Sequence, residues 1–159
     1  MPSEEAPIHQ TRDTAGTRAW GALLQVHAAL VPVLDRELQA AVGLPLAWYD
    51  VLLELNSAPD RRLQMSELGA RVVLSRTRVS RVVDELARAD LVTRLPHPTD
   101  GRSTFAEITA AGRRRLRAAA PVYLRGIEEH FARHLTAREV TTIATGLWRV
   151  HEAERGSAG

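Results

Sequence analysis

The segment SRTRVSRVVDELARADLV, residues 75–92, constrains the fold more than any other part of the chain. Four of its apolar residues recur at helical spacing and fall within about 100° of arc on a helix. These four residues are Val79, Val82, Val83 and Leu86. Its basic residues come mainly in the first half and its acidic residues in the second half. The segment therefore predicts an amphipathic helix with one buried side, a basic front end and an acidic rear.

A second, shorter helix is predicted immediately before this segment. Ser66 is placed to cap a helix that runs through Leu68 to about Val73. A tight turn follows, and Ser75 at its end can cap the amphipathic helix. Two short helices joined by a tight turn, the second polar and basic at its front, form the helix-turn-helix pattern. In that pattern the front of the second helix reaches base edges in the major groove, so duplex DNA is the expected partner.

Two candidate strands follow the amphipathic helix. The sequences LVTRL at 91–95 and TFAEIT at 104–109 alternate in polarity and flank the turn-forming stretch PHPTDGRS. We expect a β-hairpin with its tip near Asp100 and Gly101. Arg102 would lie at or beside that tip, within reach of a neighbouring minor groove or of the phosphate backbone. A helix-turn-helix followed by such a hairpin is a winged helix-turn-helix.

Further helices are predicted on both sides of this lobe. Apolar residues at steps of three and four predict a long helix over about 18–42, and LAWYDVLLEL predicts a mostly buried helix over 46–55. Thr109 can cap a helix that runs to about His134, and a capping box at residues 136–139 opens a last helix. One apolar seam follows that last helix, formed by Val140, Ile143, Ala144, Leu147 and Val150. The expected fold class is mainly α with a small β-hairpin wing.

Charge is distributed unevenly along the 159 residues. The net charge is only +2, but residues 61–117 hold 13 arginines and 6 acidic residues, a local charge of +7. The rest of the chain holds 8 arginines and 13 acidic residues. A basic middle third between acidic ends favours a polyanionic partner. Charge alone leaves open a solvated basic face without a partner, and the run RRRLR at 113–117 fits either description.

Several function classes are disfavoured by the composition. The chain has no cysteine, which excludes disulfides and thiol chemistry. It has no apolar run of about 18 residues that would predict a membrane span, and its polar, acidic start does not form a secretory signal. A cytoplasmic location is therefore expected. The sequence carries no Gly-rich phosphate loop, nucleophile elbow or His-Glu-x-x-His motif, so neither an enzyme nor a cofactor is predicted.

The stretch MSELGARVVLSRTRVSRVVDELARADLVTRLPHPTDGRSTFAEITAAGRRRL resembles the MarR family of bacterial transcriptional regulators. The most specific signal is Pro98-x-Asp100-x-Arg102-Ser103, followed after a strand by Thr109-x-x-Gly112. The resemblance covers most of the chain and implies an obligate homodimer that binds a pseudo-palindromic site and either represses or activates transcription, with repression as the expected outcome. It also implies relief by a small ligand, for example an aromatic or phenolic effector, bound between the dimer helices and the DNA-binding lobe. The implied location is the bacterial cytoplasm, at the nucleoid through DNA binding.

The resemblance also assigns ranges and residues. It implies a single domain over 1–159, with dimerisation helices at 18–45 and 110–155 and a winged helix-turn-helix lobe at 46–109. The residues that match the front of the recognition helix are Ser75, Arg76, Thr77, Arg78, Ser80 and Arg81. The residues that match the wing are Asp100 and Arg102, and the predicted DNA-binding set is completed by Ser66, Arg94 and Ser103.

Two positions depart from the family pattern. Asp90 stands where glycine is frequent after the recognition helix, and aspartate tolerates the left-handed conformation that this position needs. Gly101 replaces a residue that is often basic, which leaves Arg102 to make the minor-groove contact alone.

A ligand site and a metal site are both conceivable from the sequence. Aromatic and polar residues near the junction of the first two helices predict a pocket for an aromatic acid, lined by Trp20, His27, Trp48 and Asp50, with Tyr49 nearby. The alternative is that these aromatics are core residues and that Asp50 is the structural partner of an arginine. His130 and His134 have the spacing of two zinc ligands on one helix, and Glu129, His27 or His151 could complete a site. No third ligand is determined by the sequence, so no metal is predicted.

A third class of function competes with DNA binding and catalysis. The winged lobe could serve as a protein interface in a dimer that does not bind DNA. A steep dependence of duplex binding on salt concentration would separate the two possibilities, because phosphate contacts release counterions.

Overall fold

The computed structural model describes residues 14–157, and the chain falls into two units. The first unit ends at Val33 and the second begins at Leu34, so helix α1 (Ala15–Val42) crosses the boundary between them. The described part of the first unit is the N-terminal portion of α1. This helix begins slightly earlier than predicted and continues through Pro32.

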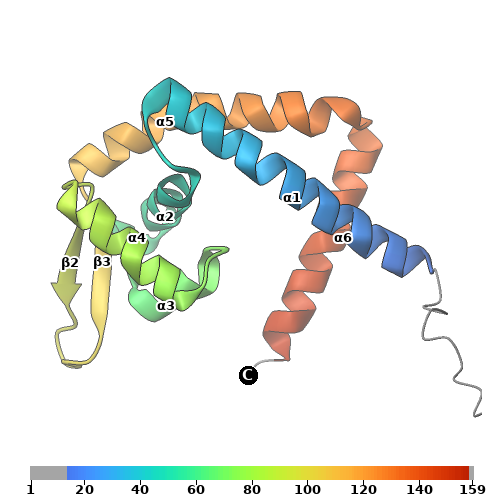
Figure 1. The fold of residues 1–159 in the computed structure, drawn as a ribbon. Helices are drawn as coiled ribbons and strands as arrows, with labels where there is room; N and C mark the ends of the chain where they lie inside the picture. The colour runs from blue at the N-terminus through green and yellow to red at the C-terminus, as the bar shows by residue number, and fades with distance from the viewer. Residues whose placement is uncertain (1–13, 158–159) are drawn as a thin grey trace, which may run out of the picture. The chain divides into compact units, whose positions relative to one another are not determined.

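The second unit contains the remaining helices and strands (Figure 1). In chain order they are α2 (Leu46–Ser57), the 3-10 helix η1 (Pro59–Arg61), β1 (Arg62–Gln64), α3 (Met65–Arg71), α4 (Arg76–Arg88), β2 (Val92–Pro96), β3 (Thr104–Ile108), α5 (Ala110–His130), the 3-10 helix η2 (Ala132–His134) and α6 (Ala137–Gly156). The predicted fold class, mainly α with a small β-hairpin wing, is confirmed.

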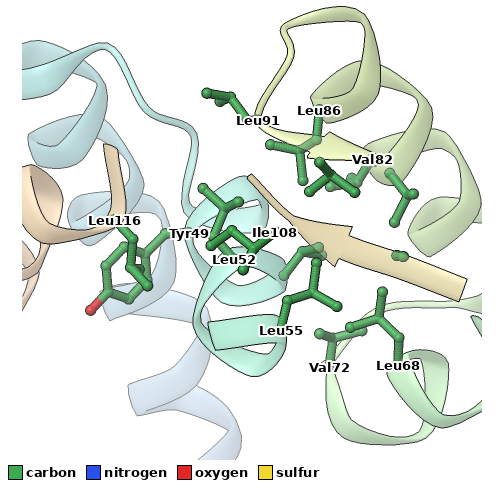
Figure 2. Close-up of a cluster of buried hydrophobic side chains, with 14 of the residues drawn as sticks. Tyr49, Leu52, Leu55, Leu68, Val72, Val82, Leu86, Leu91, Ile108 and Leu116 are labelled. Atoms are coloured by element: carbon green, nitrogen blue, oxygen red, sulfur yellow. The ribbon is translucent and has the colours of Figure 1, made fainter. Parts of the chain in front are cut away.

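The core of the second unit is built around α2 (Figure 2). Val51, Leu52 and Leu55 of this helix are completely buried. Against them pack buried residues of α3, α4, β3 and α5, among them Leu68, Val82, Leu86, Ile108 and Leu116. The buried side of α4 is the predicted stripe of Val79, Val82, Val83 and Leu86. Because burial of this apolar surface holds α4 by one side, its opposite side is left free to carry polar and charged residues.

The sheet has three antiparallel strands in the order β1-β3-β2. The hairpin β2–β3 was predicted, and its register pairs Val92 with Ile108 and Pro96 with Thr104. Strand β1 was not predicted. It has only three residues and pairs Arg62 with Glu107 at the edge of the sheet. A strand this short contains too few alternations for its polarity pattern to be recognised.

Three predicted helix caps are present in the structure. The side chain of Ser75 accepts a hydrogen bond from Arg78 N at 3.3 Å, and that of Thr109 accepts one from Gly112 N at 3.0 Å. At the start of α6 the Thr136 and Glu139 side chains form a reciprocal capping box. The hydrogen bonds from Thr136 lower the pKa of Glu139 below its usual value.

The prediction for the start of α3 was wrong. Gln64, not Ser66, is its N-cap residue, and Gln64 and Glu67 form a capping box in which Gln64 N donates to Glu67 Oε2 at 3.2 Å. The physical reason is strand β1, which keeps the chain extended as far as Gln64 and so places Glu67 three residues after the cap. Ser66 is consequently an exposed residue in the first turn of α3.

Two helices end earlier than predicted. Helix α3 ends at Arg71 rather than near Val73, and α5 ends at His130, followed by a separate 3-10 helix that contains His134. The two histidines therefore do not share one helix, so the helical spacing from which a zinc pair was considered is absent. His130 Nε2 instead lies 2.6 Å from Glu37 Oε1. No group of three His, Cys, Asp or Glu residues that could hold a metal occurs within residues 14–157.

Several polar contacts within the second unit fix the connection between α1 and α2. Gly43 ends α1 in the left-handed conformation, with φ of 62°, and its carbonyl accepts a hydrogen bond from Arg115 Nη2 at 3.1 Å. Asp35 Oδ1 accepts from Leu46 N at 2.8 Å, which caps α2 because Pro45 provides no capping side chain. No single helix among the described residues is long and apolar enough to cross a membrane; α1 and α2 meet that test only when joined across this bend.

The junction between the hairpin and α5 is unusually close. Thr109 N donates to Leu91 O at 3.0 Å, and Thr109 Oγ1 donates to Asp90 O at 2.8 Å. Asp90 has φ of 58°, as its place after the recognition helix predicted. A Cβ atom on Gly112 would lie 2.2 Å from Leu91 O, so only glycine fits here. The Thr109-x-x-Gly112 motif thus joins the end of α4 to the start of α5.

Candidate nucleic-acid interface

Helix α4 presents a basic front end to solvent. Ser75 caps it, and the five polar residues that follow it in the front half of the helix are exposed. These residues are Arg76, Thr77, Arg78, Ser80 and Arg81. Thr77, Ser80 and Arg81 lie opposite the buried stripe, and Arg76 and Arg78 flank it. Since the front of a recognition helix reaches base edges and the adjacent phosphates, this arrangement can place three arginine side chains against duplex DNA. Six residues of the predicted set, Ser75 included, therefore lie together.

The turn of the wing is ordered by side chains as well as by the backbone. His97 Nδ1 accepts hydrogen bonds from Thr99 N at 3.3 Å and from Asp100 N at 3.1 Å. Asp100 Oδ1 accepts from Arg102 N at 3.0 Å. The imidazole of His97 stacks on the ring of Phe105 with centroids 5.2 Å apart. Asp100 thus shapes the loop that carries Arg102, and the guanidinium of Arg102 remains exposed.

Ser103 closes the same turn through its backbone. Ser103 N donates to Asp100 O at 3.1 Å, and Ser103 O accepts from His97 N at 3.1 Å. Ser103 is partly buried, whereas Asp100 and Arg102 are exposed. The wing residues of the predicted set therefore divide into two groups. Ser103 and Asp100 hold the turn, and Arg102 is the residue free to reach a groove.

Arg94 lies differently from the other predicted DNA-binding residues. It is in the middle of β2, and its guanidinium is directed to α4, where Nη2 lies 3.2 Å from both Ser80 O and Ser80 Oγ. Its Nε lies 2.9 Å from Asp84 Oδ1, in an ion pair without hydrogen-bond geometry. The wing strand is therefore tied directly to the recognition helix.

The residues of the predicted ligand pocket do not all come together. Trp48 Nε1 donates to Glu85 Oε2 at 3.0 Å, and an open hollow of about 380 Å³ beside this bond is lined by Trp48, Glu85, Arg88 and Ala89. Asp50, two residues farther along α2, lies instead near Glu54, Tyr49 and Tyr123. Residues two apart on a helix point in nearly opposite directions, so Trp48 and Asp50 face different neighbours. Trp20 and His27 are exposed residues of α1 in the first unit.

Asp50 has an unusual environment for a carboxylate. Burial raises the pKa of Asp50 to about 6, and the neighbouring carboxylate of Glu54 adds to the effect. The rings of Tyr49 and Tyr123 lie 4.6 Å apart, and burial together with the charge of Asp50 raises the pKa of both phenols. Within the described residues of the second unit, no arginine forms an ion pair with Asp50, so the structural partner considered from the sequence is not found there.

We expect Asp50→Asn to raise the free energy of unfolding at pH 7.5 by about 1–3 kcal/mol and to change it little near pH 4. The folded state favours protonated Asp50, whose pKa of about 6 exceeds the ordinary value of 3.8. Stability is therefore lost as pH rises through the window between these two values, and asparagine avoids that loss. Urea unfolding at both pH values measures the difference.

The exposed Asp60 provides the control for this measurement. It has φ of 55°, a conformation that asparagine also tolerates. Asp60→Asn should shift stability little at either pH. Equal stability of wild type and Asp50→Asn at pH 7.5 would contradict the assignment of a buried, destabilised carboxylate.

Three residues that hold the interface together, Asp84, Glu85 and His97, were not predicted as site residues. Asp84 and Glu85 were described only as an acidic rear of α4, yet each binds a residue of another element, Arg94 and Trp48 respectively. His97 was treated only as part of a turn. Its place three residues before Asp100 was the available signal, since a side-chain acceptor at that position can cap a turn. No local signal pairs residues 84 and 94.

A helix-turn-helix with a basic second helix, followed by an ordered hairpin, is the winged helix class of DNA-binding lobe. Comparison with known proteins agrees with this class. A sequence model described as the MarR family matches residues 42–103. A MarR family transcriptional regulator solved in complex with DNA is also 30% identical over most of its length. This chain therefore belongs to the MarR family, and the protein is a DNA-binding transcriptional regulator.

Solved and curated relatives support the assignment over most of the chain. Sco3205, a MarR family transcriptional regulator from Streptomyces coelicolor solved in complex with DNA, is 30% identical with a TM-score of 0.78, covering 88% of this chain and 89% of that one. AbsC, a MarR family transcriptional regulator from the same organism, is 29% identical with a TM-score of 0.77, covering 90% and 97%. The HTH-type transcriptional repressor YetL of Bacillus subtilis is 27% identical over 119 residues, covering 75% and 71%.

Proposed function

We propose that this protein is a homodimeric repressor that binds a pseudo-palindromic duplex, with α4 of each protomer in the major groove and the wing beside it. The observation that carries the proposal is the division of α4 into a buried apolar side and an exposed basic front. A helix held in this way can enter a groove without losing its packing on the core. We propose repression rather than activation because the relative YetL is described as a transcriptional repressor.

Within this proposal the predicted residues have different roles. Arg76, Arg78 and Arg81 supply guanidinium groups for guanine or phosphate, since the two acceptors of guanine suit a bidentate arginine. Thr77 and Ser75 contact phosphate or base edges, as does Ser66 from the first turn of α3. Arg102 enters the minor groove, where narrow A·T-rich sequence attracts arginine.

The dimer is proposed from the apolar surface of the terminal helices. Helix α6 has no buried residue, and its exposed residues include Leu147, Trp148 and Val150. Large exposed apolar side chains gathered on one helix favour a partner surface, and a second copy of the chain provides a self-complementary one. We propose ranges 18–45 and 110–155 as the dimerisation helices and 46–109 as the DNA-binding lobe of one MarR-type domain, 1–159.

Relief by a small aromatic or phenolic effector is a further part of the proposal. Buried acids with a raised pKa occur more often at functional sites than elsewhere, and Asp50 is such an acid. Its neighbour Tyr123 is only partly buried and provides aromatic surface for a ring. Binding of candidate phenols to wild type and to Asp50→Asn, followed by calorimetry, tests this part separately from DNA binding.

We expect Arg81→Ala to change sequence preference rather than only affinity. Arg81 projects from the exposed side of α4, so its loss should remove about 1–3 kcal/mol of discrimination at one base pair in each half-site. Selection of duplexes from a random pool by wild type and variant gives the two preferences.

Arg88→Ala is the matched control for this selection. Arg88 is an exposed arginine at the rear of the same helix, and its Nε donates to Asp84 O at 3.3 Å. Arg88→Ala should therefore select the same duplex sequence as the wild-type protein. If Arg81→Ala weakened all duplexes equally, Arg81 would be a phosphate contact. If wild type selected no sequence and showed no salt dependence, the winged lobe would be better explained as a protein interface.

A further inference from the structure

Arg94 of β2 bridges one full turn of α4. Its Nη2 reaches Ser80 O and Ser80 Oγ, each at 3.2 Å, and its Nε lies 2.9 Å from Asp84 Oδ1. Ser80 and Asp84 are four residues apart, so they lie one above the other on the same face of the helix. A single guanidinium therefore contacts two successive turns of the recognition helix.

The backbone of Arg94 is held firmly at the other end of this contact. In the antiparallel register Arg94 pairs with Ala106 of β3, and Ala106 is completely buried. The Nε atom is itself buried, although about 30% of the Arg94 side chain remains exposed. The arginine therefore joins a fixed strand to the middle of α4 and is directed to the protein rather than to a groove.

We infer that Arg94 is a positioning residue for sequence recognition rather than a contact to DNA phosphate. This inference rests on the proposed function of α4 as the recognition helix. By holding Ser80 and Asp84 against β2, Arg94 sets the rotation of α4 about its axis and the position of the wing relative to that helix. The neighbouring Arg81 then meets the same base edge in each encounter, because precise positioning of a recognition group depends on the residues that support it.

Lysine distinguishes the two roles of residue 94. A phosphate contact needs mainly a positive charge, which lysine supplies as a compact ammonium group. A bridge from Asp84 to the Ser80 carbonyl needs the rigid, planar fork of arginine. We therefore expect Arg94→Lys to behave like Arg94→Ala in sequence discrimination, whereas a phosphate contact would be largely restored by lysine.

The experiment measures binding to two duplexes across a range of salt concentrations. One duplex is selected from a random pool by the wild-type protein, and the other has the same composition in scrambled order. The variants are Arg94→Ala, Arg94→Lys, Asp84→Asn and the double variant Arg94→Ala/Asp84→Asn, with Arg102→Ala as the exposed-arginine control.

Arg94→Ala and Asp84→Asn should each lower the ratio of the two affinities by roughly 5–50-fold, and the double variant should lower it little further. The salt slope should stay unchanged for Arg94→Ala, while Arg102→Ala should reduce it by about one per protomer.

Two results would overturn the inference. The first is an equal loss of affinity for both duplexes in Arg94→Ala, with a reduced salt slope and recovery in Arg94→Lys. The second is tighter binding of both duplexes by Asp84→Asn, which would mean that this acid only repels DNA.

Hydrogen exchange of the free protein separates this inference from the proposed function. Arg94→Ala should speed exchange of the α4 amides around Ser80, and Arg102→Ala should not, since local opening reports the loss of a local restraint. Unchanged exchange in Arg94→Ala would overturn the positioning role whatever the DNA results. A wild-type protein that preferred neither duplex would instead contradict the proposed function, and exchange would still decide whether Arg94 holds α4.

Discussion

Replacing Gly112 by alanine is expected to lower the free energy of unfolding by about 3–5 kcal/mol. The added Cβ would lie 2.2 Å from Leu91 O and 2.8 Å from Ile108 Cγ1, both far inside normal contact. The Leu91 carbonyl cannot easily move away, because it also accepts the hydrogen bond from Thr109 N at 3.0 Å. Ile108 is buried in the core, so it has little freedom either. The end of α4 and the start of α5 would have to separate.

Urea unfolding measures this effect, at one protein concentration for all variants because association contributes to apparent stability. Gly69→Ala is the matched control, since Gly69 also lies inside a helix and a Cβ there would meet nothing within 4 Å. That control should raise stability by up to about 1 kcal/mol, the usual preference of a helix for alanine. A Gly112→Ala protein that unfolded at the wild-type urea concentration would show that the hairpin and α5 can move apart freely.

Deleting residues 136–159 is expected to yield a monomer whose affinity for a duplex with two half-sites is lower by about 10²–10⁴-fold. Helix α6 contributes no buried residue to its own protomer, so the core around α2 should survive its removal. The deletion removes the exposed side chains of Trp148 and Val150, which are 64% and 62% accessible. These side chains belong to the surface that we propose to contact the second copy of the chain. Without the dimer, the second half-site is no longer bound at high effective concentration.

Light scattering and gel-shift titration of the truncated protein measure both effects. In the full-length chain, Leu147→Glu should weaken the dimer in the same direction because it places a charge in the apolar seam of α6. Val73→Glu is the control, since Val73 is 82% exposed but lies in the turn before α4 and outside the terminal helices. The dimer proposal would fail if the truncated protein remained a dimer, or if it were a monomer with full affinity for the duplex.

The elements that carry the interface were predictable because their signals are local. The helical spacing of Val79, Val82, Val83 and Leu86 is enough to predict a helix, and these four residues form the buried side of α4. Ser75 and Thr109 cap their helices through residues three positions away. The wing turn was readable from PHPTDGRS for the same reason. Interactions within a few residues are encoded in spacing, which needs no knowledge of the fold.

Contacts between distant segments were decided by the tertiary structure. Ser66 lost its predicted capping role because β1 pairs with β3, about forty positions farther along the chain. His130 meets Glu37 across 93 positions, and Trp48 meets Glu85 across 37. No spacing rule relates such partners, since their distance depends on how the intervening elements pack.

The same limit applies to the chemistry of individual side chains. Arg94 looks in the sequence like one more arginine of a basic segment, and its direction toward Asp84 and Ser80 follows only from the position of β2 beside α4. The raised pKa of Asp50 arises from burial first, and burial is a property of all the elements around a residue together. The sequence by itself determined the class of fold and the basic front of α4, because the spacing of apolar residues and the order of charged residues are properties of the sequence alone. Which charges are free for DNA and which are held inside the protein was decided by packing, because only packing determines what each side chain can reach.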